Sequence, residues 1–169
     1  LMQYFGLEVR QGGPEEDFFG IYDHYIMNPY RPAAANPLTE DLAGAFVVSP
    51  QGSVIGLDQV HHNVRQNMTT ANVKRLFIQV YLNWRYRDRL ALPAKTWSFG
   101  WGSHTQDFAA GSESRQALVE VAQWLDQHFV GQSGASGSLI ARWSTQLASA
   151  EEYFVWEVAH PGESSFDCN

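Results

Sequence analysis

Residues 73–87 read VKRLFIQVYLNWRYR, and the conformation of this stretch decides the fold. One apolar stripe recurs at helical spacing and comprises Val73, Leu76, Phe77, Val80, Tyr81 and Trp84. A strict alternation fits as well, with one side of a strand formed by Leu76, Ile78, Val80, Leu82, Trp84 and Tyr86. Because β-branched and aromatic residues favour strands, the alternation predicts a long strand over residues 75–87.

Alternation and turn residues predict further strands along the chain, and one segment has a strong helical pattern. The helix is expected over residues 112–129, where Ser112 can cap its N-terminus and Leu118 and Leu125 belong to its buried stripe. A shorter helix is expected within 14–27. The predicted strands are 3–9, a hairpin of 45–48 with 53–57, then 96–102 paired with 75–87, and finally 139–145 and 154–158.

These elements together predict a fold class of α+β, with residues 1–169 forming a single domain. Its antiparallel sheet would have five to seven strands, with one long helix (about 112–129) packed on a face and one or two short helices. A chain of 169 residues is long enough for one hydrophobic core, and 44% of it is hydrophobic against 17% charged. The profile is that of a packed globular protein.

Cysteine content and hydropathy give expectations about the compartment. The single cysteine, Cys168, cannot form a disulfide within the chain, which suits a reducing cytoplasm. No apolar run reaches the length of about 18 residues that a membrane span needs, so no membrane association is expected. The sequence begins Leu1-Met2, which leaves open a removed leader and with it a periplasmic or secreted location.

The charges are distributed unevenly. Residues 65–95 hold seven Lys or Arg and one acid, whereas the chain as a whole has a net charge of −7. On a strand, Arg85 and Arg87 would share a face beside Trp84 and Tyr86, which is the composition of an aromatic and cationic binding surface. The alternative is an ordinary solvated face in which these arginines pair with acids such as Glu157.

One loop is the best candidate for chemistry. Within residues 102–107, His104 lies close to Asp107, and such a pair can serve as general base and orienting carboxylate. The competing interpretation is a turn in which polar side chains bond backbone amides. Trp97 and Trp101, with Trp124, could line an aromatic pocket beside this pair. The glycine run 131–137 follows a helix, the reverse of a phosphate-binding loop, and is expected to be a flexible connector.

No cofactor or metal site is predicted, because the common metal and nucleotide motifs are absent from the sequence. The favoured hypothesis is a non-catalytic protein-interaction module, such as an acidic inhibitor or immunity-type protein that masks a basic protein partner. The alternative is a small-molecule enzyme or ligand-binding protein that uses His104, Asp107 and the aromatic pocket. Nucleic-acid binding through Arg85, Arg87 and Arg89 is the weakest hypothesis, because the rest of the chain would repel phosphate.

Overall fold

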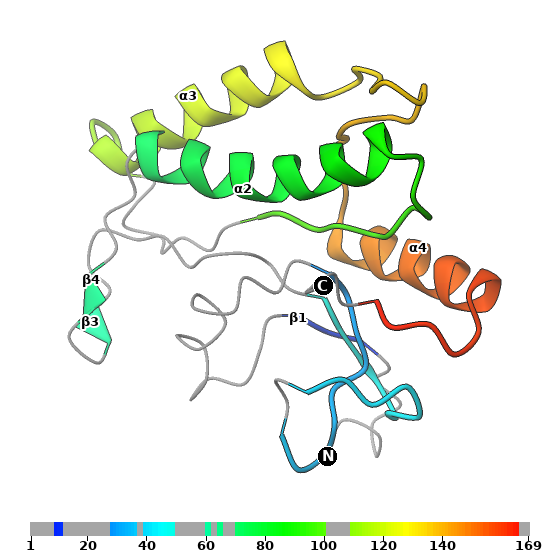
Figure 1. Ribbon diagram of the computed structural model, residues 1–169. Helices are drawn as coiled ribbons and strands as arrows, with labels where there is room; N and C mark the ends of the chain where they lie inside the picture. Colours follow the sequence, from blue (N-terminus) through cyan, green and yellow to red (C-terminus); the bar gives the residue numbers. More distant parts are fainter. Residues whose placement is uncertain are drawn as a thin grey trace. The chain divides into compact units, whose positions relative to one another are not determined.

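The computed structural model describes residues 9–11, 28–36, 39–49, 60–61, 64–65, 70–100 and 109–165. Within these ranges it has three helices, α2 (Thr70–Arg89), α3 (Glu113–His128) and α4 (Gln146–Ala159), which Figure 1 labels. The strands are short and form two separate pairs. β1 (Val9–Gln11) runs parallel to β2 (Val47–Ser49), and β3 (Val60–His61) runs antiparallel to β4 (Val64–Arg65).

The predicted antiparallel sheet of five to seven strands is wrong for the described residues. Residues 75–87, expected to be its central strand, lie inside α2. The helical stripe is the one that the protein buries, because Val73, Phe77 and Val80 are all buried. The alternating pattern would have buried Leu82 and Tyr86 too, yet these side chains are 51% and 63% exposed. The strand preference of the residue types was overridden by packing against α3.

Three other predicted strands are also wrong in their described parts. Residues 154–158 lie in α4, which begins after Thr145, whose side chain accepts a hydrogen bond of 3.1 Å from the Ala148 N–H. Residues 139–145 form only isolated bridges, one of which joins Ser133 to Leu139. The described part of 96–102, up to residue 100, is irregular rather than a strand paired with 75–87.

The predicted long helix is confirmed as α3. Ser112 caps it as expected, since its side chain accepts a hydrogen bond of 3.3 Å from the Arg115 N–H. β2 overlaps the predicted strand 45–48 at residues 47 and 48, but it pairs in parallel with β1. The partner expected for it, 53–57, lies outside the described residues, as do most of the predicted strand 3–9 and the predicted helix within 14–27.

The chain divides into two compact units. The first comprises Leu1–Gly52, Lys95–Gly100 and Ser144–Asn169, and the second comprises Ser53–Ala94 and Trp101–Trp143. α4, β1 and β2 therefore belong to the first unit, whereas α2 and α3 belong to the second. The proposal of one domain over residues 1–169 stays a prediction, and the two units are described separately.

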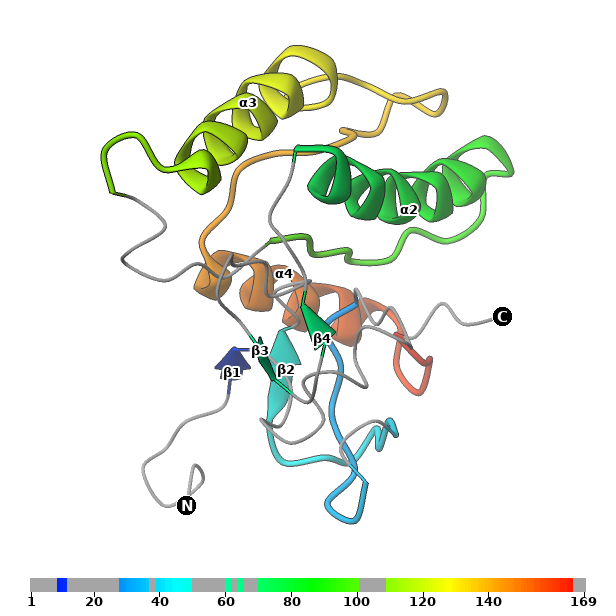
Figure 2. The ribbon, with the colours of Figure 1, turned by 90° about the vertical axis from the view of Figure 1, so that its left-hand side faces the viewer.

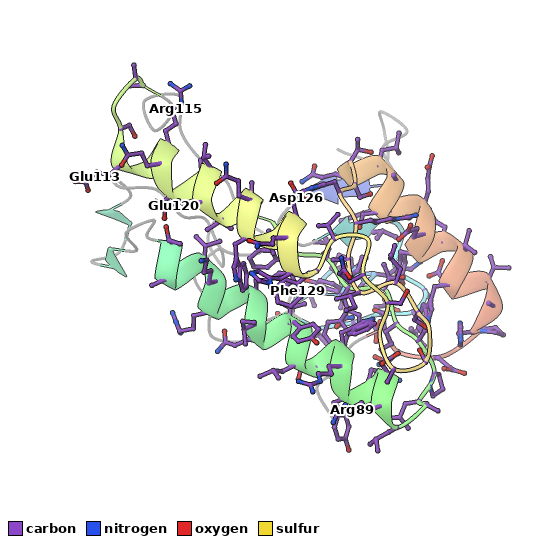
Figure 3. All side chains as sticks on the ribbon, turned by 90° about the horizontal axis from the view of Figure 1, so that it is seen from above. Arg89, Glu113, Arg115, Glu120, Asp126 and Phe129 are labelled. Carbon is purple, nitrogen blue, oxygen red and sulfur yellow. The ribbon has the colours of Figure 1, made fainter. Side chains whose placement is uncertain are left out.

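In the second unit, α2 and α3 lie side by side and run in the same direction (Figure 1). The Thr70 hydroxyl, at the start of α2, donates to Glu120, in the middle of α3, at 2.8 Å. Farther along, the ring of Phe129 lies 4.7 Å from that of Phe77 and 5.0 Å from that of Tyr81, at the end of α3 labelled in Figure 3. Edge-to-face contacts of this kind add to the burial of apolar surface. Aromatic rings thus form the interface between the helices.

A turn after α3 is attached to the C-terminal end of α2. Asp88 accepts hydrogen bonds from the Ala135 N–H at 2.8 Å and the Ser136 N–H at 3.3 Å, and also from the Ser136 hydroxyl. The same hydrogen bonds hold the pKa of the Asp88 carboxyl below its usual value. The glycine run is therefore an ordered turn and not the predicted flexible connector. Gly131 and Gly137 supply its positive φ angles of 73° and 86°.

In the first unit, α4 packs on β2, which runs beside β1 (Figure 2). Val47 from the strand meets Tyr153 and Trp156 from the helix, and all three residues are buried. Tyr30 and Val48 form a second buried cluster. The buried Asn28 is satisfied, because its side-chain amide donates to the Thr96 carbonyl at 2.8 Å. This small core fixes which side of α4 faces inward.

Candidate functional site

The inner side of α4 is held by an ion pair. The Arg31 guanidinium donates from Nε to Oε1 of Glu157 at 2.5 Å and from Nη2 to Oε2 at 2.8 Å, while Nη1 donates to the Gly44 carbonyl at 2.9 Å. The Tyr153 hydroxyl adds a hydrogen bond of 3.2 Å to Oε1 of Glu157. Such bidentate, charge-assisted bonding is specific in geometry, so it orients the helix as well as anchoring it.

The electrostatics of this ion pair follow from its contacts. Hydrogen bonds from Arg31, followed by its positive charge, hold the pKa of the Glu157 carboxyl below its usual range, against the opposing effect of burial. Burial first, and the charge of Glu157 second, raise the pKa of the Tyr153 hydroxyl. Glu157 is therefore ionised and Tyr153 neutral at neutral pH, which is the state that the hydrogen bonds require.

The segment after α4 is anchored too. Glu40 accepts hydrogen bonds from the Ser165 N–H at 3.0 Å and from the Ser165 hydroxyl at 2.8 Å, and the Ser164 hydroxyl donates to its other oxygen. These hydrogen bonds attach the segment after α4 to Glu40, while Thr145 caps the start of the helix.

The outer side of α4 carries exposed aliphatic side chains. Leu147 is 65% exposed, Val155 72% and Val158 83%. Their spacing, with exposed Glu151 between them, places all four residues on one face of a helix. We call Leu147, Glu151, Val155 and Val158 the α4 face. Single exposed aliphatic residues are ordinary, whereas larger exposed apolar patches are often binding surfaces in proteins.

The outer side of α2 carries a second exposed face of opposite charge. Leu82 and Tyr86 lie on it together with exposed Arg75 and Arg89, at intervals of seven, four and three residues. We call Arg75, Leu82, Tyr86 and Arg89 the α2 face. Tyrosine and arginine are the residue types that contribute most to protein interfaces. Arg89 lies at the C-terminal end of the helix (Figure 3), where its positive charge interacts favourably with the helix dipole.

The predicted cationic pair does not form a shared surface. Arg85 and Arg87 are two residues apart on a helix, which separates their side chains by about 200° around its axis. Arg87 donates from Nε and Nη2 to the Pro93 carbonyl at 3.0 Å and 2.7 Å, so it closes the turn after α2. Glu157, named as a possible partner for these arginines, pairs instead with Arg31.

The other predicted site residues are only partly described. His104, Asp107 and Trp101 lie outside the described residues, and the catalytic or ligand-binding role proposed for them stays a prediction. Trp97 is half-buried in the first unit. Trp124 belongs to α3, and the Lys74 ammonium lies 5.0 Å from the centre of its ring, a cation–π contact within the second unit. Trp124 is thus part of the helix interface.

Metal sites and membrane spans were sought only in the described ranges. There, no three His, Cys, Asp or Glu side chains come together as metal ligands could. None of α2, α3 and α4 combines the length and the apolar character that crossing a membrane demands.

Sequence reasoning missed the α4 face because it assigned 154–158 to a strand. The signal that could have found it is the segment that precedes those residues. Thr145 is followed by QLASAEE, which lacks β-branched residues and is rich in helix formers, and Ala150, Tyr153 and Trp156 then repeat every third residue.

Comparison with known proteins identified no relative: no protein-family model, no curated protein and no solved structure matches this chain.

Proposed function

We propose that this chain is a non-catalytic protein-interaction module that binds a partner protein through the α4 face. The observation that carries the proposal is the exposure of Leu147, Val155 and Val158 on a helix whose opposite side is held by the Arg31–Glu157 pair. Burying aliphatic surface is favourable by about 25 cal/mol per Å². A face already fixed by its own core loses little conformational entropy on binding.

The charge of the face indicates the kind of partner. α4 contains three glutamates and no lysine or arginine, and Glu151 lies among the exposed aliphatic residues. The partner that fits is a protein with an apolar patch flanked by lysine or arginine. The net charge of −7 would speed its approach and make the association rate sensitive to salt. An inhibitor or immunity-type protein that masks a basic partner has these properties.

The proposed setting is the cytoplasm. The support is chemical: with a single cysteine, the chain has no internal disulfide that an oxidising compartment would be needed to form.

The test is site-directed photo-crosslinking followed by binding with purified proteins. A photoreactive residue at position 158 should yield a protein adduct in host cells, whereas the same residue at Ser136, on the exposed turn after α3, should not yield that adduct. The protein identified by mass spectrometry is then purified and titrated against this chain. Val155→Asp combined with Val158→Asp should weaken binding at least about tenfold, because it places charges in an apolar contact.

Two results would overturn the proposal. One is the absence of any protein adduct at position 158. The other is a purified partner that binds the double aspartate variant as tightly as the wild-type chain. Both substituted valines are largely exposed, so the variant should keep its fold, which circular dichroism checks.

A further inference from the structure

We infer that a second copy of this chain is a partner for the α4 face, and that it binds with its α2 face. The inference rests on the proposed function, since it takes the α4 face to be a docking surface. Both faces have exposed apolar side chains, and their charges are opposite in sign. Every copy of the chain carries both faces. The resulting contact is heterologous, joining two different surfaces.

The two faces are similar in length. The α4 face runs from Leu147 to Val158, twelve residues and about 16 Å along the helix axis. The α2 face runs from Arg75 to Arg89, fifteen residues and about 21 Å. Leu82 and Tyr86 lie near one end of this span, so the exposed aliphatic groups of one helix can cover the leucine and tyrosine of the other.

The charges on the two faces have opposite signs. α2 contains five lysines and arginines and one acid, Asp88, which is engaged by the turn after α3. α4 contains only acids, of which Glu157 is engaged by Arg31. Arg75 and Arg89 make no ion pair within the described part of the chain. These arginines and Glu151 are thus the charges available for contacts between copies, and they attract each other.

Each copy carries both faces, so a single contact leaves one α4 face and one α2 face open to further copies. A nucleic acid fits the α2 face less well, because phosphates would pair with the arginines but leave Leu82 exposed.

The test is sedimentation velocity of the full chain at low salt over a wide range of protein concentrations. The wild-type chain should pass from monomer to larger species as concentration rises. Arg75→Glu combined with Arg89→Glu should weaken self-association at least about tenfold, and so should Glu151→Arg, because each places like charges across the contact. Arg115→Glu is the matched control, since Arg115 is exposed near the start of α3 (Figure 3) and on neither face.

The decisive arm mixes the two charge-reversed variants. Every contact between one variant and the other again joins opposite charges, so the mixture should associate about as tightly as the wild-type chain although neither variant does so alone. Tyr86→Ser weakens the same contact without reversing a charge, and serves if a reversed variant fails to fold. The inference is overturned by a wild-type chain that stays monomeric, by reversed variants that still self-associate, or by a mixture of the two variants that stays monomeric.

Failure of the second-copy inference can be distinguished from failure of the proposed function. A monomeric chain that still forms an adduct with a different protein at position 158 overturns the second-copy inference and leaves the interaction module in place. If no adduct forms at position 158, either with a second copy or with a different protein, both the second-copy inference and the proposed function are overturned.

Discussion

Replacing Glu157 with glutamine should destabilise the first compact unit by about 2 kcal/mol. Glu157 accepts three hydrogen bonds, two from Arg31 and one from Tyr153. Glutamine keeps one acceptor oxygen, but its NH2 group replaces the other oxygen. This NH2 group would face the N–H groups of Arg31, so a donor would meet a donor. Arg31 would keep its hydrogen bond to Gly44 but lose its counter-charge.

The magnitude follows from the burial of the pair. The side chains of Arg31 and Glu157 are 19% and 29% exposed. Fully exposed pairs contribute roughly 0 to 1 kcal/mol, whereas removing one partner of a fully buried pair costs roughly 3 to 5 kcal/mol. A largely buried, bidentate pair lies between these limits. Hydrogen bonds to charged groups, worth about 1.5 to 3 kcal/mol each, support the same value.

The assay is urea denaturation followed by tryptophan fluorescence, since Trp156 packs beside Tyr153 in this unit. The pH dependence supplies a second readout. Because the folded-state pKa of Glu157 is lowered, its stabilisation is complete above the unfolded value of about 4.3 and is lost as the pH falls through the folded pKa. The gap between wild type and Glu157→Gln should therefore be constant at neutral pH and close in acid.

The control is Glu163→Gln, which removes the charge of an exposed glutamate just after α4 and should change stability by less than about 0.5 kcal/mol. The reasoning is refuted if Glu157→Gln is as stable as the control, or if its difference from wild type persists unchanged at acid pH.

Three further predictions concern the second unit. Gly134→Ala should destabilise it by about 1 to 3 kcal/mol in thermal or chemical denaturation, because the added Cβ would lie 2.4 Å from the Trp84 ring. Asp88→Asn should loosen the turn after α3, measured as faster proteolysis there, and acid should have the same effect on wild type, since a carboxyl with a lowered pKa stabilises only while ionised. Phe129→Ala should cost about 3 to 5 kcal/mol, whereas Leu147→Ala on the α4 face should leave stability nearly unchanged.

Sequence reasoning succeeded where local signals agreed. In α3, the capping residue Ser112, the acid in the first turn and the stripe containing Val121 and Leu125 all indicate a helix between the same limits. Each of these signals acts within a few residues along the chain, so no knowledge of the fold is needed to interpret it. The same holds for the uneven charge, which α2 and α4 carry as helices of opposite sign.

The fold depended on contacts that are distant in the sequence. Residues 73–87 fit both the spacing of a helix and the alternation of a strand, because Val80 and Trp84 belong to the apolar set of each pattern. The rings of Trp124 and Phe129, about fifty residues farther along, pack against Phe77 and thereby select the helical stripe.

The sequence by itself determined α3 with its Ser112 cap and the charge of each segment, since these follow from neighbouring residues. Only the tertiary structure decided which side of α2 and of α4 faces outward. For α4 the deciding pair, Arg31 and Glu157, is separated by 126 positions. An ion pair across that distance forms only when the chain has already folded, so alternation along the sequence could not reveal it.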